Sequence, residues 1–244
     1  MVLKLAITMP VYNESEGITT FIEELDSSFG SDCVFFIVDD CSFDDSYSKI
    51  QSLAKKEGFK NRIKLYRNFR NLGHGPTFSR AVNAAIDANP EFILTLDGDG
   101  QFLGTQLMDA FRFFLDSQLP YMETIRSNRQ DALYRKIISA FTRLLVFSKS
   151  RKISKDANSP CRFYRHAFAK DIWKKIPDNT IVPNIHVSIL TRRTQAEFEY
   201  FKVKSIPRRS TNKIGTMWGT SRVHLPSRKF TIFCLKAINY VFKI

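Results

Sequence analysis

Hydrophobic and polar positions alternate along the first hundred residues so that short apolar runs are separated by longer amphipathic stretches. The apolar runs are rich in β-branched and aromatic side chains, which is typical of strands. They cover residues 3–9, 34–38, 63–66 and 92–96. The stretches between them, 16–28, 44–58 and 76–88, are predicted to be helical. Because parallel strands need helical crossovers, this order predicts an open, mostly parallel sheet with helices on both faces.

The second half of the chain continues with longer and more basic elements. We expect helices at 104–117, 131–148, 167–175 and 185–196, strands at 120–125 and 198–205, and a loop up to residue 165. A chain of 244 residues with 43% hydrophobic content can bury one substantial core. We therefore predict a single Rossmann-like α/β domain over 1–205, followed at 206–244 by a basic loop and an amphipathic C-terminal helix.

Charge is distributed unevenly between the two halves of the chain. Residues 1–123 contain 11 Lys or Arg and 18 Asp or Glu, whereas residues 124–244 contain 26 and 6, so the halves carry net charges of −7 and +20. An acidic half suits a cation, and a basic half suits nucleic acid, anionic lipid or a diphosphate. The sequence therefore predicts two different binding tasks.

The start of the chain has neither a long apolar segment nor a small-residue cleavage site, so no secretion signal is expected. The four cysteines form no Cys-x-x-Cys pair, and a chain of this size does not need disulfides for its stability. We therefore expect reduced thiols and a cytoplasmic protein.

Polar residues follow each of the first four predicted strands, where packing does not explain them. The segments are 10–14, 39–42, 71–75 and 97–101. In an open parallel sheet the loops at the carboxyl ends of the strands line the ligand crevice, so we expect the four segments to converge. Asp44 and Asp45, by contrast, fit a turn or a helix N-cap.

Asp97 and Asp99 are the strongest candidates for binding a metal ion. Gly98 and Gly100 give the backbone the freedom to aim both carboxylates at one divalent cation, Mg²⁺ or Mn²⁺, together with diphosphate oxygens. Taken alone, this Asp-Gly-Asp-Gly string also suits a tight turn or part of a calcium loop. The calcium interpretation lacks the further oxygen ligands and the closing Glu that such a loop requires.

Together the four segments resemble the inverting glycosyltransferases of family two, which have the GT-A fold, and the resemblance extends over nearly the whole chain. The motifs that carry it are Pro-Val-Tyr-Asn-Glu, Val-Asp-Asp-Cys-Ser, Asn-Leu-Gly-His-Gly and Leu-Asp-Gly-Asp-Gly-Gln. Within the family the chain is most similar to the dolichyl-phosphate-mannose-synthase-like branch. The resemblance implies a metal-dependent transferase that uses a UDP- or GDP-linked sugar.

The resemblance also implies roles for individual residues around the donor. Pro10, Tyr12 and Glu14 border the base and ribose, and Asp40 contacts the nucleobase. Asp97 and Asp99 flank the ribose and the metal-bound diphosphate. The further donor-binding positions are Gly73, Gly75, Gln101 and Arg209. For Gly73 and Gly75 a loop that enters a helix is an equal alternative, and the segment around Arg209, which resembles an Arg-rich closing loop of the family, also fits a basic linker.

The basic half supplies a second group of candidates. Arg126 and Arg129 follow a predicted strand, and the arginine fork suits phosphate oxygens, so with Arg162 and Arg165 they are candidates for a phosphate clamp. Residues 156–162 resemble the acceptor loop of the family, although Pro160-Cys161 replaces its Gly-Phe.

The acidic motif with which many family members deprotonate an acceptor hydroxyl is missing, because the matching stretch 183–186 contains no carboxylate. A phosphate acceptor is already ionised at neutral pH and needs no base, which favours transfer to a polyprenyl phosphate. The alternative is a hydroxyl acceptor on a lipid-linked or soluble glycan, with Asp156 as the preferred base over His186.

Residues 230–244 read as an amphipathic helix that is too short to cross a bilayer, which needs ~20 apolar residues. It fits a helix lying on anionic lipid at the cytoplasmic membrane face, and it fits docking on the protein itself or a dimer contact equally well.

A nucleotidyltransferase would need a Gly-rich basic loop after the first strand, which is absent. A nucleic-acid-binding module lacks interleaved aromatic residues, so no nucleic acid partner is expected.

Overall fold

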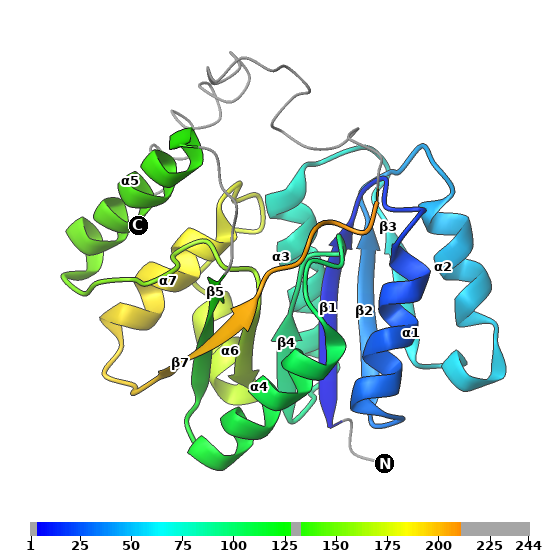
Figure 1. Ribbon diagram of the computed structural model, residues 1–244, viewed down its shortest axis with the longest axis horizontal. Helices are drawn as coiled ribbons and strands as arrows, with labels where there is room; N and C mark the ends of the chain where they lie inside the picture. The colour runs from blue at the N-terminus through cyan, green and yellow to red at the C-terminus, as the bar shows by residue number, and fades with distance from the viewer. Residues whose placement is uncertain (1–3, 128–132, 211–244) are drawn as a thin grey trace.

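The computed structural model of the chain describes residues 4–127 and 133–210, which form one seven-stranded sheet with helices on both faces (Figure 1). The strands are β1 (Leu5–Val11), β2 (Cys33–Asp39), β3 (Ile63–Arg67), β4 (Phe92–Thr95), β5 (Tyr121–Ser127), β6 (Arg162–Arg165) and β7 (Glu199–Lys204). The helices are α1 (Ile18–Phe29), α2 (Ser46–Ala54), η1 (Glu57–Phe59, a 3-10 helix), α3 (His74–Asp87), α4 (Gly104–Ser117), α5 (Leu133–Ser150), α6 (His166–Trp173) and α7 (Pro183–Arg193).

The strand order is β3-β2-β1-β4-β6-β5-β7. Strands β3, β2, β1 and β4 are parallel, and so are β5 and β7, whereas β6 is antiparallel to both of its neighbours, β4 and β5. The expected mostly parallel sheet is therefore confirmed. Because β1 lies between β2 and β4, the loop that follows β1 has the loops after β2 and β4 on either side.

Strand β6 was not predicted, because a loop was expected up to residue 165, and the helix expected at 44–58 ends at Ala54 and is followed by the separate η1. Two of the four residues of β6 are arginines, which hid the strand from a hydrophobicity pattern. Arg162 is nevertheless fully buried, because its guanidinium donates hydrogen bonds to the carbonyl oxygens of Ser159 (2.9 Å) and Asn184 (3.0 Å) and to the hydroxyl of Ser188 (2.8 Å).

The two faces of the sheet are covered by different helices, as the alternation within β1 dictates. Leu5, Ile7 and Met9 point to the face that carries α1, α2 and α4, and Ala6 points to the face that carries α3, α6 and α7. Each covering helix places an apolar stripe on the sheet, which is where the core forms.

Helix α5 lies outside these two layers. Its Leu145 and Val146 pack against Ile185 and Ile189 of α7 in a third, smaller cluster, so α5 is attached to the domain through α7 rather than through the sheet. Within the described residues no helix combines the length and apolarity that crossing a bilayer requires. The C-terminal helix expected at 230–244 lies outside the described residues, and the expected boundary at residue 205 stays a prediction.

Candidate active site

The four polar segments meet at the carboxyl ends of the parallel strands. The amide of Asp40 donates to the carbonyl oxygen of Val11 (2.8 Å), and the amide of Asn68 donates to that of Asp39 (2.8 Å). On the other side of β1, the amide of Gly98 donates to the carbonyl oxygen of Pro10 (3.2 Å). These backbone bonds join the loops after β1, β2, β3 and β4 into one rim.

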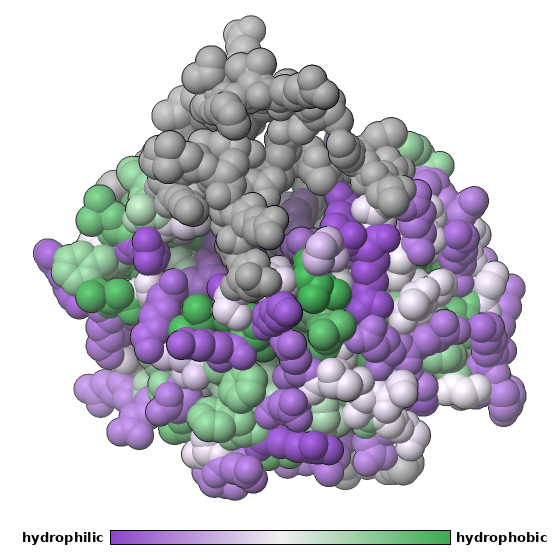
Figure 2. Space-filling view, viewed as in Figure 1, coloured by the Kyte–Doolittle hydropathy of each residue, from purple (hydrophilic) through white to green (hydrophobic). Residues whose placement is uncertain are grey.

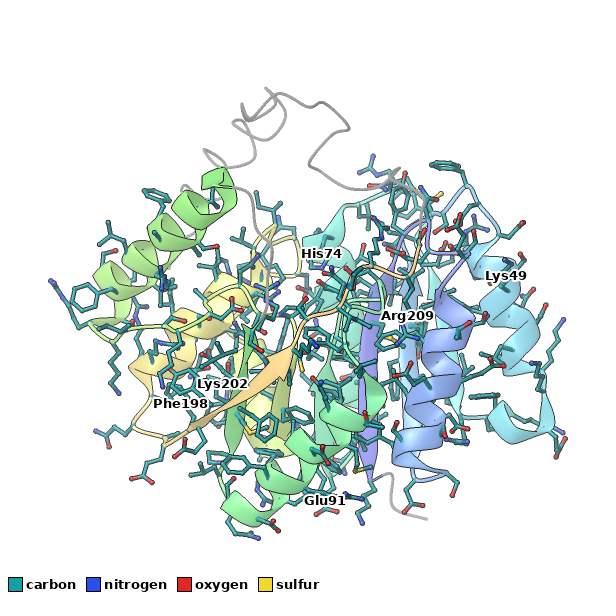
Figure 3. The ribbon with its side chains drawn as sticks, viewed as in Figure 1. Lys49, His74, Glu91, Phe198, Lys202 and Arg209 are labelled. Atoms are coloured by element: carbon teal, nitrogen blue, oxygen red, sulfur yellow. The ribbon has the colours of Figure 1, made fainter. Side chains whose placement is uncertain are left out.

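Three carboxylates lie together in this rim. Burial raises the pKa of Asp99 to about 7, and repulsion by Asp97 and then Glu14 adds to the effect. Burial also raises the pKa of Glu14 to about 7, although its hydrogen bond to Arg208 acts in the opposite direction. The Nε2 atom of His74 lies 2.8 Å from Oδ1 of Asp97, within hydrogen-bonding distance. His74 is at the start of α3, at the same end of the sheet (Figure 3). Unfavourable charge of this kind is relieved when a cation binds.

The chemistry of these carboxylates fits a divalent cation that is shared with a second ligand. Asp97 and Asp99 supply hard oxygen donors, which Mg²⁺ and Mn²⁺ prefer. Among residues 4–127 and 133–210 no group of three or more His, Cys, Asp or Glu side chains is arranged to hold a metal ion. A cation at Asp97 and Asp99 would therefore need further oxygens from a ligand or from water. Gly98 is required here, because a Cβ would lie 2.7 Å from the Pro10 carbonyl oxygen.

A segment that follows β7, residues 205–210, lies across this rim. The amide of Ile206 donates to the carbonyl oxygen of Gln101 (3.0 Å), and the amide of Arg209 donates to that of Asp99 (3.3 Å). We call residues 205–210 the strap. It brings two arginines that are distant in sequence to the loop that carries Asp97 and Asp99.

The two arginines of the strap make different contacts. Arg209, expected to bind the donor, is held by the protein itself: its guanidinium donates to Glu24 (2.5 Å) and to the Gly100 carbonyl oxygen (3.0 Å) and lies over the ring of Phe21 (5.0 Å). Figure 3 shows Arg209 on this segment, beside α1 and β1. Arg208 belongs to the same Arg-rich segment but was not chosen as a donor-binding position, and it pairs with Glu14. A segment without a periodic pattern offers no means of choosing between neighbouring arginines.

Asp40, expected at the nucleobase, is buried and has both of its oxygens engaged. They accept hydrogen bonds from the side-chain amide of Asn68 and from the backbone amides of Leu72 and Gly73, each at 2.8 Å. Asp40 thus fixes the path of the loop after β3. Gly73 adopts a positive φ of 87° at the start of α3.

Gly75 has a packing role in the first turn of α3. A Cβ at this position would lie 2.2 Å from the Thr180 carbonyl oxygen and 2.6 Å from the Ile181 Cα. The close approach of two backbones explains a glycine here without a ligand.

The aromatic residues of the rim include one that the sequence analysis did not select. Pro10 is buried within β1. Tyr12, the first residue after this strand, makes an edge-to-face contact with Phe43 at a centroid distance of 6.2 Å. Phe43 is largely exposed despite its size. An exposed aromatic ring beside Tyr12 suits a flat ligand group such as a nucleobase.

Arg126, a candidate for the phosphate clamp, and Asp156, the preferred candidate base, form a two-pronged ion pair. Arg126 Nε lies 2.8 Å from Asp156 Oδ2, and its second nitrogen lies 2.9 Å from Oδ1. The same guanidinium also donates to the Asn158 carbonyl oxygen (3.2 Å). The pair holds the expected acceptor loop against the end of β5. Arg129 lies outside the described residues.

Three further candidates, Arg162, Arg165 and His186, have no side chain that is open to a ligand at the rim. Arg162 cannot clamp a ligand phosphate, because it is fully buried and donates to protein oxygens, which corrects the expectation for this residue. The clamp was also expected to include Arg165, which donates to the Leu119 carbonyl oxygen (3.1 Å) at the opposite end of β6. His186 is buried, and neither ring nitrogen has a hydrogen-bond partner within the described part of the chain. Burial lowers its pKa to about 4.

Comparison with known proteins gives a family match and several relatives. The sequence pattern of the family described as Glycosyl transferase family 2 matches residues 6–173. Curated relatives from several Salmonella strains, including Salmonella paratyphi B and Salmonella newport, are named undecaprenyl-phosphate 4-deoxy-4-formamido-L-arabinose transferase. They are 28% identical over 194 residues, which is 78% of this chain, and the chain spans only 57% of their length.

Solved structures share the fold. S. aureus TarS in complex with UDP-GlcNAc has a TM-score of 0.56 at 19% identity, covering 86% of this chain and 62% of that one. Glucosyl-3-phosphoglycerate synthase from Mycobacterium tuberculosis, solved with Mn²⁺, UDP and phosphoglyceric acid, has a TM-score of 0.58 at 11% identity, covering 86% and 72%. Mannosyltransferase PcManGT from Pyrobaculum calidifontis, solved with GDP-Man and Mn²⁺, has a TM-score of 0.54 at 14% identity, covering 88% and 59%. These similarities confirm the expected GT-A fold.

Proposed function

The chain belongs to glycosyl transferase family 2, and on this basis we propose that it moves a sugar from a UDP- or GDP-linked donor to a polyprenyl phosphate at the cytoplasmic face of a membrane. The observation that carries the proposal is the acidic rim, where Asp97, Asp99 and Glu14 lie together at the ends of parallel strands. The names of the curated relatives support the acceptor class.

The rim offers separate places for the parts of a nucleotide sugar. Tyr12 and Phe43 present aromatic rings at the ends of β1 and β2, where a base can stack. Asp97 and Asp99 lie on the neighbouring loop after β4, and Arg208 reaches the same region from the strap. The proposed donor therefore extends from the β2 side of the rim to the β4 side, with its diphosphate next to the carboxylates.

A divalent cation, Mg²⁺ or Mn²⁺, fits between these carboxylates and a diphosphate for the reasons given above. When bound, it would offset the negative charge that develops on the leaving diphosphate. The protein's own contribution is to hold Asp97 and Asp99 on a loop that the Gly98 contact with Pro10 and the strap contact with Asp99 keep in place. Arg208 supplies positive charge beside the same leaving group.

The acceptor side favours a group that is ionised before it reacts. Asp156 is the preferred candidate base, yet both of its oxygens accept hydrogen bonds from Arg126. A carboxylate held in this way is a weaker proton acceptor than one without a cationic partner. A polyprenyl phosphate attacks through an oxygen that already carries charge, so Asp156 can serve to position Arg126 and the acceptor loop instead.

A direct assay tests the proposal. The full chain would be incubated with a panel of UDP- and GDP-linked sugars, with Mg²⁺ or Mn²⁺, and with polyprenyl phosphate dispersed in detergent. We expect one donor to yield a glycosylated polyprenyl phosphate, and we expect Asp99→Asn to abolish this product. Asp109→Asn is the matched control, because Asp109 is an exposed aspartate on α4 that pairs only loosely with Arg112 (3.8 Å).

Two outcomes would contradict the proposal. If no nucleotide sugar is consumed under any of these conditions, the chain has no transferase activity of this kind. If a parallel reaction with a glycan in place of the polyprenyl phosphate is the one that yields product, the proposed acceptor is wrong, and Asp156→Asn should then remove that activity because a base would be required.

A further inference from the structure

We propose that the outer face of α5 and the turn that follows it form a docking surface for an anionic lipid membrane. We call this the α5 surface and define it by four exposed apolar residues, whose exposed fractions are 48%, 62%, 40% and 74%. They are Phe141, Leu144, Phe147 and Ile153. Figure 2 shows green side chains over this part of the molecule. The inference deepens the proposed function, because it names the surface that meets the membrane.

Three of the four apolar residues of the α5 surface share one side of the helix, and Ile153 lies in the turn that follows it. Phe141, Leu144 and Phe147 follow one another at intervals of three residues, which keeps them on neighbouring turns of the same side. The opposite side, with Leu145 and Val146, packs on α7. Helix α5 thus has two apolar stripes, and α7 covers only one of them.

This concentration of apolar surface is unusual within the described part of the chain. Seven large hydrophobic residues are exposed there, and four of them belong to the α5 surface. The other three are Phe43, Phe69 and Phe113, which lie on different elements. Single exposed hydrophobic residues are ordinary, whereas a contiguous group marks an interaction site.

The charges around the α5 surface identify the kind of partner. No Asp or Glu occurs from residue 132 to residue 155. The described basic residues of this stretch are Arg143, Lys149, Arg151, Lys152 and Lys155. Apolar side chains that enter an acyl layer, with Lys and Arg beside them at the level of anionic headgroups, are the signature of a helix lying in a membrane interface.

Other partners fit this surface less well. A second copy of the chain placed on the same surface would bring like charges together, which opposes a symmetric dimer. Nucleic acid would satisfy the basic residues but would leave Phe141, Leu144 and Ile153 in water. A lipid surface with negative headgroups satisfies the apolar and the basic residues at once.

The position of the α5 surface agrees with a lipid acceptor. Ile153 lies three residues before Asp156, whose carboxylate holds Arg126 at the end of β5. A membrane in contact with α5 would therefore lie beside the acceptor loop. The phosphate of a polyprenyl chain anchored in that membrane would then be close to the loop that we expect to receive it.

Vesicle binding by the full chain tests the inference. Co-sedimentation would be measured with vesicles of phosphatidylcholine alone and of phosphatidylcholine mixed with phosphatidylglycerol. We expect binding only to the anionic vesicles, and we expect the double variant Phe141→Ser/Leu144→Ser to weaken it roughly tenfold or more. The charge variant Arg151→Glu/Lys152→Glu should weaken it as well. Phe69→Ser is the matched control, because Phe69 is an 82% exposed phenylalanine outside the α5 surface and should leave binding unchanged.

The outcomes separate this inference from the proposed function. Undiminished binding by both double variants, with circular dichroism showing that they are folded, overturns the inference. So does a change from dimer to monomer on light scattering without any effect on vesicle binding. Transfer to a short-chain polyprenyl phosphate in detergent should survive the Phe141→Ser/Leu144→Ser change, because no membrane is present. Vesicle binding without any sugar transfer by the unmodified chain would support the α5 surface and contradict only the proposed activity.

Discussion

The guanidinium of Arg208 pairs with the carboxylate of Glu14, a residue 194 positions earlier in the chain. The pair closes the strap over the end of β1, next to Asp99. Burial is the main cause of the raised pKa of Glu14, and the hydrogen bond and positive charge of Arg208 partly counteract it. A diphosphate at the same rim offers Arg208 a more highly charged partner.

We expect Arg208→Ala to impair donor use rather than folding. The change leaves Glu14 without its cationic partner and removes positive charge from the proposed diphosphate site, so kcat/KM for the donor should fall roughly 10- to 100-fold. Steady-state kinetics with the donor identified in the assay above would measure this. Lys202→Ala, an exposed lysine on β7 in Figure 3, is the control and should retain normal kinetics. Unchanged kcat/KM in Arg208→Ala would show that the strap carries no donor-binding charge.

Arg209→Ala should behave differently, because Arg209 bonds Glu24 and the Gly100 carbonyl oxygen. Loss of these contacts should lower the free energy of unfolding by about 1–3 kcal/mol, measured by urea denaturation. A variant with unchanged stability but strongly impaired donor binding would support the donor-binding role predicted for Arg209.

The sequence predicted the fold well because the features that determine it are local. The apolar runs of β1 to β4 and the amphipathic helices between them are short-range patterns, and the parallel order follows from them. Strand β6 was not predicted because Arg162 is a charged residue, which a hydrophobicity pattern assigns to the surface. Its burial is possible because it donates to the carbonyl oxygens of Ser159 and Asn184. A one-dimensional pattern contains no information about such distant partners.

In the site, too, local patterns identified single residues, whereas contacts between distant segments were not predicted. Asp97 and Asp99 were identifiable because they follow a strand directly, and strand ends converge in any parallel sheet. The pairing of Arg208 with Glu14 and of Arg126 with Asp156 joins segments that are far apart in sequence. Those pairings decide which arginine faces a ligand and which carboxylate is engaged, so no local motif predicted them.

We expect Asp99→Asn to remove the stabilisation by ligand without destabilising the apo protein. Asp99, Asp97 and Glu14 repel one another, so removing one charge should leave the apo melting temperature unchanged or slightly higher. The increase in melting temperature that Mn²⁺ with UDP or GDP gives the unmodified chain should be lost. Thermal unfolding with and without these ligands measures both effects, with Asp109→Asn as the control. A full ligand-induced increase in Asp99→Asn would exclude Asp99 from the binding site.

Gly75→Ala tests whether Gly75 is present for packing. A Cβ would overlap the Thr180 carbonyl oxygen at 2.2 Å, and backbone atoms on both sides cannot move independently. We expect a loss of about 1–3 kcal/mol in the free energy of unfolding, measured by urea denaturation. Gly58→Ala is the control, because a Cβ at Gly58 would meet no atom within 4 Å. Normal stability together with weakened donor binding in Gly75→Ala would point to donor contact instead.

His186 should make stability depend on pH. Burial lowers its pKa from 6.5 to about 4, so between these values the unfolded chain binds a proton that the folded chain does not. Stability that is present above pH 6.5 is therefore lost as the pH falls towards 4, by about 2 kcal/mol between pH 7 and pH 5 for this residue.

The variant His186→Leu should remove this loss, because leucine cannot bind a proton. Glu14 and Asp99 have raised pKa values and contribute with the opposite sign, so the informative quantity is the difference between the unmodified chain and the variant at each pH. Urea denaturation at pH 7 and pH 5 measures it, and equal m-values confirm that the same surface unfolds. A difference that does not grow as the pH falls would mean that His186 reaches solvent or a partner in solution.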